Sequence, residues 1–445
     1  MTCQSYPPPT RKCMKLIYAR QIFDSKGVPT VEVDLITDLG LFRASIPSAN
    51  SQGPYDCVEI RDENDKDFFG KGVCKVVHNI NSIIGPELLK QEFDVTEQEK
   101  VDQFLKDLDG TENKSKYGAN SLLGVSLAVC KAGAAKRGLP LYRHIADLAG
   151  IKTVVLPVPV FSVMMGGQVA SNKLPYKEFT ILPTGATSFA EAMKMGTETY
   201  HCLAKILRDR YGVAAITVGD AGGFVPANIK TTKEALQFIV RAIQAAGYTG
   251  RVQIGMDAAA SKFLVRGLYD LDFKNRKSDP KKRKKPGDML KIYTDMVNTY
   301  HIVSIQDPFD KEDFHAWANI NSRLHIQIVG NELTATNPQR IMTAVNEKAC
   351  NACILNLTQI GTVSEAIRIH LLAKENDLGT VICHSDGETE DTFEADFAVG
   401  LSNGQVIFGA PCRAEHLSRY NQILRIEEEL GKDVRYAGQA FRRPL

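Results

Sequence analysis

The chain has 445 residues, a formal net charge of +2, 44% hydrophobic and 24% charged residues, which is the ordinary composition of a soluble globular protein. No apolar run approaches the roughly 20 residues of a membrane-spanning helix, and the first 13 residues lack the apolar stretch of a secretory signal, so we expect a flexible extension over residues 1–13. The ten cysteines are scattered, which indicates reduced thiols in a cytosolic or nuclear protein.

Residues 14–150 predict a small α+β domain. Three runs within residues 14–47 alternate apolar and polar side chains and are separated by turn residues, which indicates an antiparallel meander. The small polar residues 48–53 then predict a loop, and helical periodicity dominates the rest. A meander followed by helices is typical of the α+β class. The expected helices are residues 71–91, 96–108 with Thr96 as N-cap, and 120–149.

Residues 151–445 change to strands that alternate with helices, which predicts an eight-stranded parallel (β/α) barrel. Several apolar strands end abruptly at a polar residue, as IVSIQDPF does at Gln306. In such barrels the chemistry lies at the rim where these strands end. A long excursion over residues 184–251 shows that the first units are not simple repeats. The expected strands are residues 156–164, 178–183, 252–257, 302–306, 326–331, 352–356, 380–384 and 405–409, with helices at 232–246 and 363–375.

Residues 274–287 form a basic loop between a strand and a helix of the barrel. Within it, positive charge is concentrated from Lys274 to Lys285, with a single acid, Asp279. Such a run can be a nuclear-import or nucleic-acid patch, or only a solvated loop. No aromatic residue interleaves with the charges, which weakens a base-stacking role.

Five motifs identify a family. ARQIFDSKGVPTVEVD, GTENKSKYGANSLLGVSLAVCKAGA, SIQDPF, DGETED and GAPCRAEHLSRYNQILRIEEELG closely resemble enolase, the glycolytic phosphopyruvate hydratase. The resemblance runs from Met14 to Leu445. It implies an enolase-type barrel carrying an N-terminal α+β domain, a homodimer, and a site for 2-phosphoglycerate with two Mg²⁺ ions.

The resemblance also implies a base and an acid, because the family removes a weakly acidic proton beside a carboxylate and then expels a hydroxyl group. The family's basic lysine matches Asn356, and its acidic glutamate matches Ala221 in GDAGGF. An amide cannot take up a proton at neutral pH, and a methyl group has none to give. Glu178 and His384 are retained catalytic positions.

The family's metal ligands are only partly retained. Asp257 is present, but Gln306 and Asn331 stand where the resemblance implies carboxylates, so the formal charge of the three positions falls from −3 to −1. We expect Glu332 not to replace Asn331, because neighbours on a strand point to opposite faces. Ser51 matches the serine that binds the second metal.

The positions that hold the anionic substrate are altered in the same way. Val169 replaces a histidine of the family, Ser385 an arginine and Ile407 a lysine. The acid Asp386 follows Ser385. We therefore expect weak binding of Mg²⁺ or none, and doubt a small anionic substrate.

Because the substitutions fall on the rim, we predict a catalytically inactive or severely impaired enolase-like protein that acts as a binding or structural partner. It would form a homodimer, or a heterodimer with an active enolase. Two alternatives stay open: a different lyase or acid-sugar enzyme on the same barrel, and a functional glycolytic enolase. We expect a cytoplasmic location and neither a membrane nor a nucleic-acid partner, although the basic residues Lys281 to Lys285 leave a nuclear role open.

Overall fold

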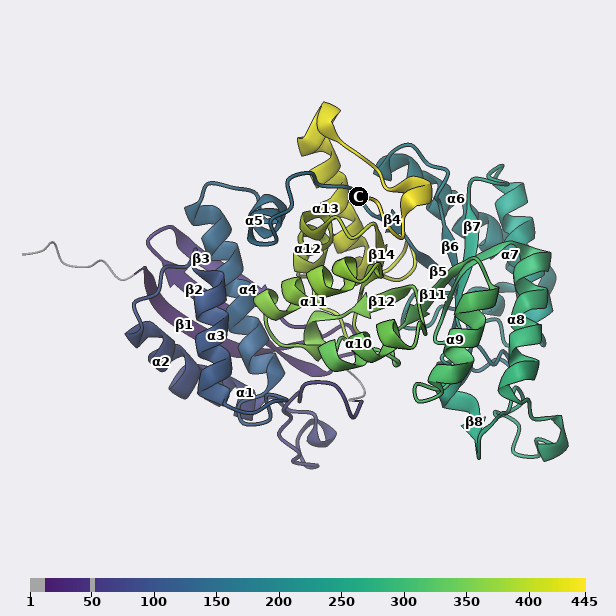
Figure 1. The fold of residues 1–445 in the computed structure, drawn as a ribbon, viewed down its shortest axis with the longest axis horizontal. Helices are drawn as coiled ribbons and strands as arrows, with labels where there is room; N and C mark the ends of the chain where they lie inside the picture. The colour runs from purple at the N-terminus through teal and green to yellow at the C-terminus, as the bar shows by residue number, and fades with distance from the viewer. Residues whose placement is uncertain (1–12, 49–52) are drawn as a thin grey trace, which may run out of the picture.

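The computed structural model describes residues 13–48 and 53–445, so Ser51 and all of the expected extension except Cys13 lie outside it. The N-terminal part packs a three-stranded sheet against helices (Figure 1). Its elements are β1 (Met14–Phe23), β2 (Pro29–Thr37), β3 (Gly40–Ser45), α1 (Cys74–Asn79), a π-helical turn (Ile80–Ile84), α2 (Gly85–Lys90), α3 (Gln98–Asp109), α4 (Ala119–Lys136) and α5 (Leu141–Leu148).

The antiparallel meander is confirmed, with β2 between β1 and β3. The turn between β1 and β2 is organised by Asp24, whose Oδ1 accepts the backbone N–H groups of Lys26 and Val28, both at 2.8 Å. Gly27 has a φ of 71° there, a conformation that L side chains rarely adopt. On the helical side, Gly124 of α4 lies so close to the sheet that a Cβ would come within 2.6 Å of Val33. A side chain at that position would push α4 off the sheet.

Two helix predictions need correction. The second helix begins at Gln98 with Glu97 as N-cap, and the Thr96 hydroxyl donates to Asp94 instead of capping the helix. The expected helix 120–149 is two helices, α4 and α5, because Gly138 has a φ of 64° and Pro140 cannot donate a backbone hydrogen bond.

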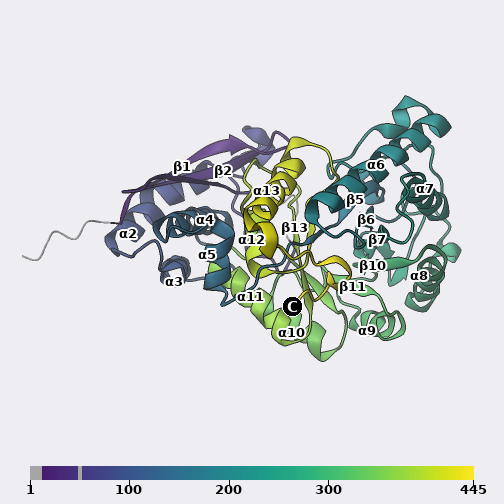
Figure 2. The same cartoon turned by 90° about the horizontal axis from the view of Figure 1, so that it is seen from above.

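The second part is a barrel surrounded by helices, which Figure 2 shows from above. Its strands are β4 (Val158–Pro159), β5 (Phe161–Met165), β6 (Glu178–Leu182), β7 (Gln253–Asp257), β10 (Ile302–Gln306), β11 (Gln327–Gly330), β12 (Ala352–Leu355), β13 (Gly379–Cys383) and β14 (Gln405–Ile407). Its helices are α6 (Phe189–Tyr211), α7 (Thr232–Ala245), α8 (Pro286–Tyr300), α9 (Phe314–Arg323), α10 (Pro338–Asn346), α11 (Val363–Glu375), α12 (Phe393–Leu401) and α13 (Ala414–Leu430). A hairpin of β8 (Leu264–Val265) and β9 (Leu268–Tyr269) lies between β7 and α8.

The barrel closes through one segment, which was expected as a single strand over residues 156–164. That segment is two strands: β4 pairs with β14, and β5 pairs with β6. Because consecutive strands of one segment lie at the two ends of the sheet, this segment brings the ends together and the barrel is nearly closed. The expectation of an all-parallel barrel is wrong at β6, which runs antiparallel to both β5 and β7.

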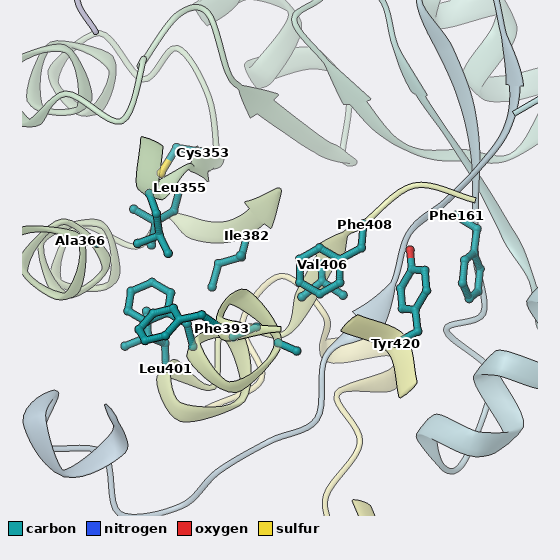
Figure 3. Close-up of a cluster of buried hydrophobic side chains, with 14 of the residues drawn as sticks. Phe161, Cys353, Leu355, Ala366, Ile382, Phe393, Leu401, Val406, Phe408 and Tyr420 are labelled. Atoms are coloured by element: carbon teal, nitrogen blue, oxygen red, sulfur yellow. The ribbon is translucent and has the colours of Figure 1, made fainter. Parts of the chain in front are cut away.

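The core lies between the sheet and the outer helices. Figure 3 shows part of it, where side chains of β12, β13 and β14 meet those of the helices outside them. There the rings of Phe161 and Tyr420 lie 5.1 Å apart, and Phe408 lies 5.8 Å from Tyr420. This packing holds the strand ends in fixed positions, which a rim site requires. Among the helices within the described ranges, none is long and apolar enough to cross a membrane.

Candidate functional site

A row of polar side chains lies across three neighbouring strands at the rim. Glu178 of β6 pairs with Asp257 of β7, and Asp257 is in register with Gln306 of β10. Glu178 is at the start of its strand whereas the other two are at strand ends. They meet because β6 runs antiparallel to β7, which brings its first residue to the rim formed by the last residues of the others.

A cavity of about 540 Å³ opens at this rim. It gathers nearly all of the residues that the sequence singled out: Val169, Glu178, Asp257, Gln306, Asn331, Asn356, His384, Ser385 and Ile407. Ala221 is buried and lines a small adjoining cavity of about 60 Å³, which shares Glu178 and His384 with the larger one. The sequence-predicted residues that the structure describes therefore converge, and Ser51 lies outside the described residues.

Lys177 also lines this cavity, and sequence reasoning missed it. Its Nζ lies 3.5 Å from Oε1 of Glu178 and 3.6 Å from Oδ2 of Asp257. Burial alone would lower the pKa of Lys177, but the carboxylates of Glu178, Asp257 and Asp386 more than offset it and raise that pKa well above its usual value. Lys177 is therefore an ammonium at neutral pH. The sequence feature that could have identified Lys177 is its place immediately before the rim residue Glu178.

Asp257 is surrounded by hydrogen-bond donors. Its Oδ1 accepts the backbone N–H of Ala259 at 2.9 Å, and its Oδ2 accepts the side-chain amide of Gln306 at 3.1 Å. Burial raises the pKa of Asp257, Lys177 lowers it and Glu178 raises it, and the net value is about 6. At pH 7 Asp257 is thus mostly ionised, with Lys177 as its counter-ion.

His384 follows β13 and faces both cavities. Its Nδ1 lies 2.9 Å from the carbonyl oxygen of Ile407. Since a carbonyl only accepts, Nδ1 carries the proton and Nε2 keeps its lone pair. Burial lowers the pKa of His384. The neighbouring ring of His416 lies 5.6 Å away, and burial together with the His384 charge lowers the pKa of His416 to about 3. Both imidazoles are therefore neutral at pH 7.

Two family models match this chain. The model described as "Enolase, N-terminal domain" matches residues 14–145, and the model described as "Enolase, C-terminal TIM barrel domain" matches residues 153–445. The chain belongs to the enolase family. The rim cavity of the barrel is thus the place to compare with the catalytic site that this family uses, position by position.

Asn356, which the sequence resemblance leads us to expect at the position of the family's base, follows β12. Its Oδ1 accepts the backbone N–H of Thr358 at 3.0 Å and the Thr358 hydroxyl at 2.8 Å. The amide nitrogen faces Ser385, 3.4 Å away. Asn356 therefore serves as a local cap of the turn that follows its strand, and it has no basic atom to offer a substrate.

The residues present do not fit the Mg²⁺ ions that enolases usually use. Two N–H donors and an ammonium converge on Asp257, where a cation needs free oxygen lone pairs. The Gln306 amide presents its nitrogen to Asp257, the opposite of a ligating orientation. Within the described ranges, no group of three or more His, Cys, Asp or Glu side chains is placed to hold a metal ion.

Glu332 lines the cavity together with Asn331, so the expectation that it points away is wrong. Strand β11 ends at Gly330, and the alternation of faces no longer applies beyond that point. The backbone N–H groups of both residues donate to the buried Asp307 carboxylate. Glu332 itself pairs with Lys262 at 2.9 Å. It is thus a neutralised carboxylate at the cavity wall.

The three positions that we expected to bind an anionic substrate carry neutral side chains. Val169 is 60% exposed at the cavity mouth, Ile407 is half-buried in β14, and the Ser385 backbone N–H donates to Glu388 at 2.6 Å. Carboxyl groups outnumber ammonium groups six to three along the cavity wall. The acids are Asp56, Glu178, Asp257, Asp307, Glu332 and Asp386, and the bases are Lys177, Lys262 and Lys311.

The basic loop, expected over residues 274–287, is tied to the barrel at several points. Lys274 donates to the carbonyl oxygens of Ala170 and Asn172 at 3.0 and 2.8 Å, and burial lowers its pKa to about 8. Lys284 pairs through its backbone with Tyr269. The last two residues of the expected loop, 286 and 287, already belong to α8. The segment is thus a folded surface and not a free peptide.

Proposed function

We propose that this enolase-family chain does not dehydrate 2-phosphoglycerate and acts as a binding or structural partner. The observation that carries the proposal is Asn356, a hydrogen-bonded amide at the position where the family places its base. Lys177 cannot replace the base, because it is held as an ammonium by neighbouring carboxylates. Loss of a general base costs on the order of 10² to 10⁴ in rate.

The missing acid and the missing negative charge at the metal-ligand positions also support the loss of dehydration activity. Ala221 offers a methyl group in the small cavity, where the family has a glutamate. Weaker stabilisation of the dianionic intermediate costs several kcal/mol more, although the losses are not additive. From a typical turnover of about 10 per second, the remaining rate falls below detection.

The test is formation of phosphoenolpyruvate from 2-phosphoglycerate by the purified chain at saturating Mg²⁺. The expression host's own enolase must be separated first, and an Asp257→Ala variant prepared in parallel serves as the matched control. A rate equal to that of buffer supports the proposal. A rate that is clear in the wild type and lost in Asp257→Ala would overturn it.

A second candidate is a different lyase or acid-sugar enzyme on this barrel. The observation that favours it is His384, whose unprotonated Nε2 belongs to a ring that lines the same cavity as Glu178 and Lys177. The neutral imidazole of His384 is a usable base. Screening acid sugars and phosphorylated acids for turnover tests it, with His384→Gln as control. Turnover that persists in His384→Gln would contradict this assignment of the base.

We further propose that the partner is a second copy of this chain, with an active enolase as the alternative partner. Support comes from apolar side chains on the sheet of the N-terminal part: Leu16 is 45% exposed, Tyr18 48% and Leu41 51%. Soluble monomers seldom leave such side chains clustered on one sheet. Light scattering should give twice the monomer mass for the wild type. The double variant Tyr18→Glu with Leu41→Glu should give the mass of a single monomer. Val213→Glu, at an exposed barrel site, is the control, and a wild-type monomer would contradict the proposal.

For the compartment, we propose the cytoplasm, and the basic loop supplies the nuclear alternative. An import receptor that reads an extended basic peptide would have to break the backbone pairing of Lys284 with Tyr269. We therefore expect the fluorescently tagged chain to stay outside the nucleus. Alanine at Lys281, Lys282 and Lys285 should not change its distribution, whereas nuclear accumulation lost on this substitution would favour the alternative.

A further inference from the structure

We propose that the ammonium of Lys177 replaces the divalent cation in this cavity, so that the rim is built to work without metal and excludes a divalent ion. The inference extends the proposed function. It rests on the proposal that this cavity does not catalyse dehydration of 2-phosphoglycerate. It assigns to Lys177 the role of a built-in cation that positions Asp257 and Glu178.

The backbone places Lys177 at the rim and leaves it little freedom. Its carbonyl oxygen accepts the backbone N–H of Gly166 at 2.8 Å. Gly167, with a φ of 63°, packs so closely that a Cβ there would lie 3.0 Å from Cα of Lys177. The side chain starts one residue before β6 and extends into the cavity, where it is 35% exposed.

The distances match a cation shared by two carboxylates. Nζ lies 3.5 Å from Glu178 and 3.6 Å from Asp257, and both acids are buried. Two buried carboxylates on paired strands repel each other unless a positive charge lies between them. Lys177 supplies that charge from within the chain, and no ion has to be recruited from solution.

The same arrangement works against a divalent ion at Asp257. An ion there would lie within a few ångströms of the ammonium, and the two positive charges would repel each other strongly in this partly buried site. Both oxygens of Asp257 already accept hydrogen bonds, from Ala259 and Gln306. A metal would therefore have to displace Lys177 and turn the Gln306 amide around, and it would gain only one net negative charge from Asp257, Gln306 and Asn331.

The test measures Mn²⁺ binding to the full chain by calorimetry and by the electron paramagnetic resonance signal of free Mn²⁺. Six proteins are compared: wild type, Lys177→Gln, Lys177→Arg, Asp257→Asn, the pair Gln306→Glu with Asn331→Asp, and that pair with Lys177→Gln added. We expect wild type and Lys177→Arg to bind no stoichiometric Mn²⁺ at the rim. Lys177→Gln should bind Mn²⁺ with a dissociation constant at least about tenfold below the lowest value that the absence of wild-type binding allows. Adding Lys177→Gln to the carboxylate pair should also tighten binding at least about tenfold, because it removes the competing charge.

Binding of one equivalent of Mn²⁺ by the wild type, lost in Asp257→Asn, would overturn the proposal even if Lys177→Gln fails to fold. So would equal affinities with and without Lys177 in the carboxylate pair. The readout does not depend on activity. A wild type that dehydrated 2-phosphoglycerate without binding Mn²⁺ would defeat the proposed function alone, and an inactive wild type that bound Mn²⁺ would defeat the ammonium assignment alone.

Discussion

Nε2 of Gln306 donates a hydrogen bond of 3.1 Å to Oδ2 of Asp257, across the neighbouring strands β10 and β7. A carboxylate at Gln306 could not make this contact, since it has no proton to donate at neutral pH. The amide thus converts what would be a repulsive pair into a bonded one. It suits a rim where one ammonium, that of Lys177, pairs with both Glu178 and Asp257.

The first prediction concerns this contact. Gln306→Glu should lower the free energy of unfolding by about 1–3 kcal/mol at pH 8, because two carboxylates then face each other with one ammonium. The loss should shrink at pH 5, where one proton can be shared between them. Denaturant titration at both pH values measures it. Gln306→Met, which removes the donor without adding charge, should show a smaller loss with little pH dependence, and equal losses in the two variants would contradict the argument.

A second prediction tests whether the base and the acid are the only catalytic groups that this chain lacks. Restoring only the base and acid, by Asn356→Lys with Ala221→Glu, should leave phosphoenolpyruvate formation at the level of buffer. The reason is that the negative charge developing on the substrate would still lack a metal, and Lys177 is already neutralised by Glu178 and Asp257. The same coupled assay detects it. A measurable rate in this double variant would show that Lys177 suffices as the electrophile.

Lys177 and Glu332 show where sequence reasoning stopped. The barrel, its strands and the convergence of Asp257 with Gln306 followed from apolar runs that end in polar residues, since parallel strands share a rim. The alternation of side chains between the two faces of a strand led us to expect Glu332 to point away from the cavity. Glu332 lies beyond the end of β11, where side chains no longer alternate. Lys177 precedes β6 and reaches the site only because β6 runs antiparallel to β7. No local sequence pattern predicts the direction of that strand. Hydrogen-bond orientation, as at Gln306, depends on neighbours that only the fold brings together.

A third prediction concerns the support beneath Ser385. Arg419 is fully buried between Glu388 and Glu394, and Glu388 in turn accepts the Ser385 backbone N–H. Arg419→Met should destabilise the protein by about 3–5 kcal/mol, because it leaves Glu388 and Glu394 buried without their counter-ion. Thermal and denaturant unfolding measure it.

The matched control for Arg419 is Arg368→Met, which removes an exposed pair with Glu99 and should cost no more than about 0.5 kcal/mol. The carboxyl groups also set a pH dependence. Burial raises the pKa of Glu388 even beside Arg419, so protonation at lower pH should relieve part of the damage in Arg419→Met. A variant as stable as wild type at pH 8 would refute this reading of the network.

The last prediction is a pH dependence that originates in α12. Burial raises the pKa of Asp396 to about 7, although Gln422 donates to its carboxylate at 3.0 Å. The folded state therefore holds a proton on Asp396 between about pH 4 and 7, where the unfolded chain has lost it. Since the folded state binds more protons, the contribution of Asp396 to stability is complete below pH 4 and declines as the pH rises towards 7.

Asp396→Asn imitates the protonated carboxyl group at every pH, so it should stabilise the protein by about 4 kcal/mol at pH 8 and change little at pH 4. Buried histidines oppose this trend in the wild type, because burial lowers the pKa of His370 to about 4 and the unfolded chain takes up that proton first. Comparing unfolding of the two proteins from pH 4 to 8 isolates the Asp396 contribution, since the histidines are common to both. A difference between them that stays constant across this range would show that Asp396 is ionised in the folded state.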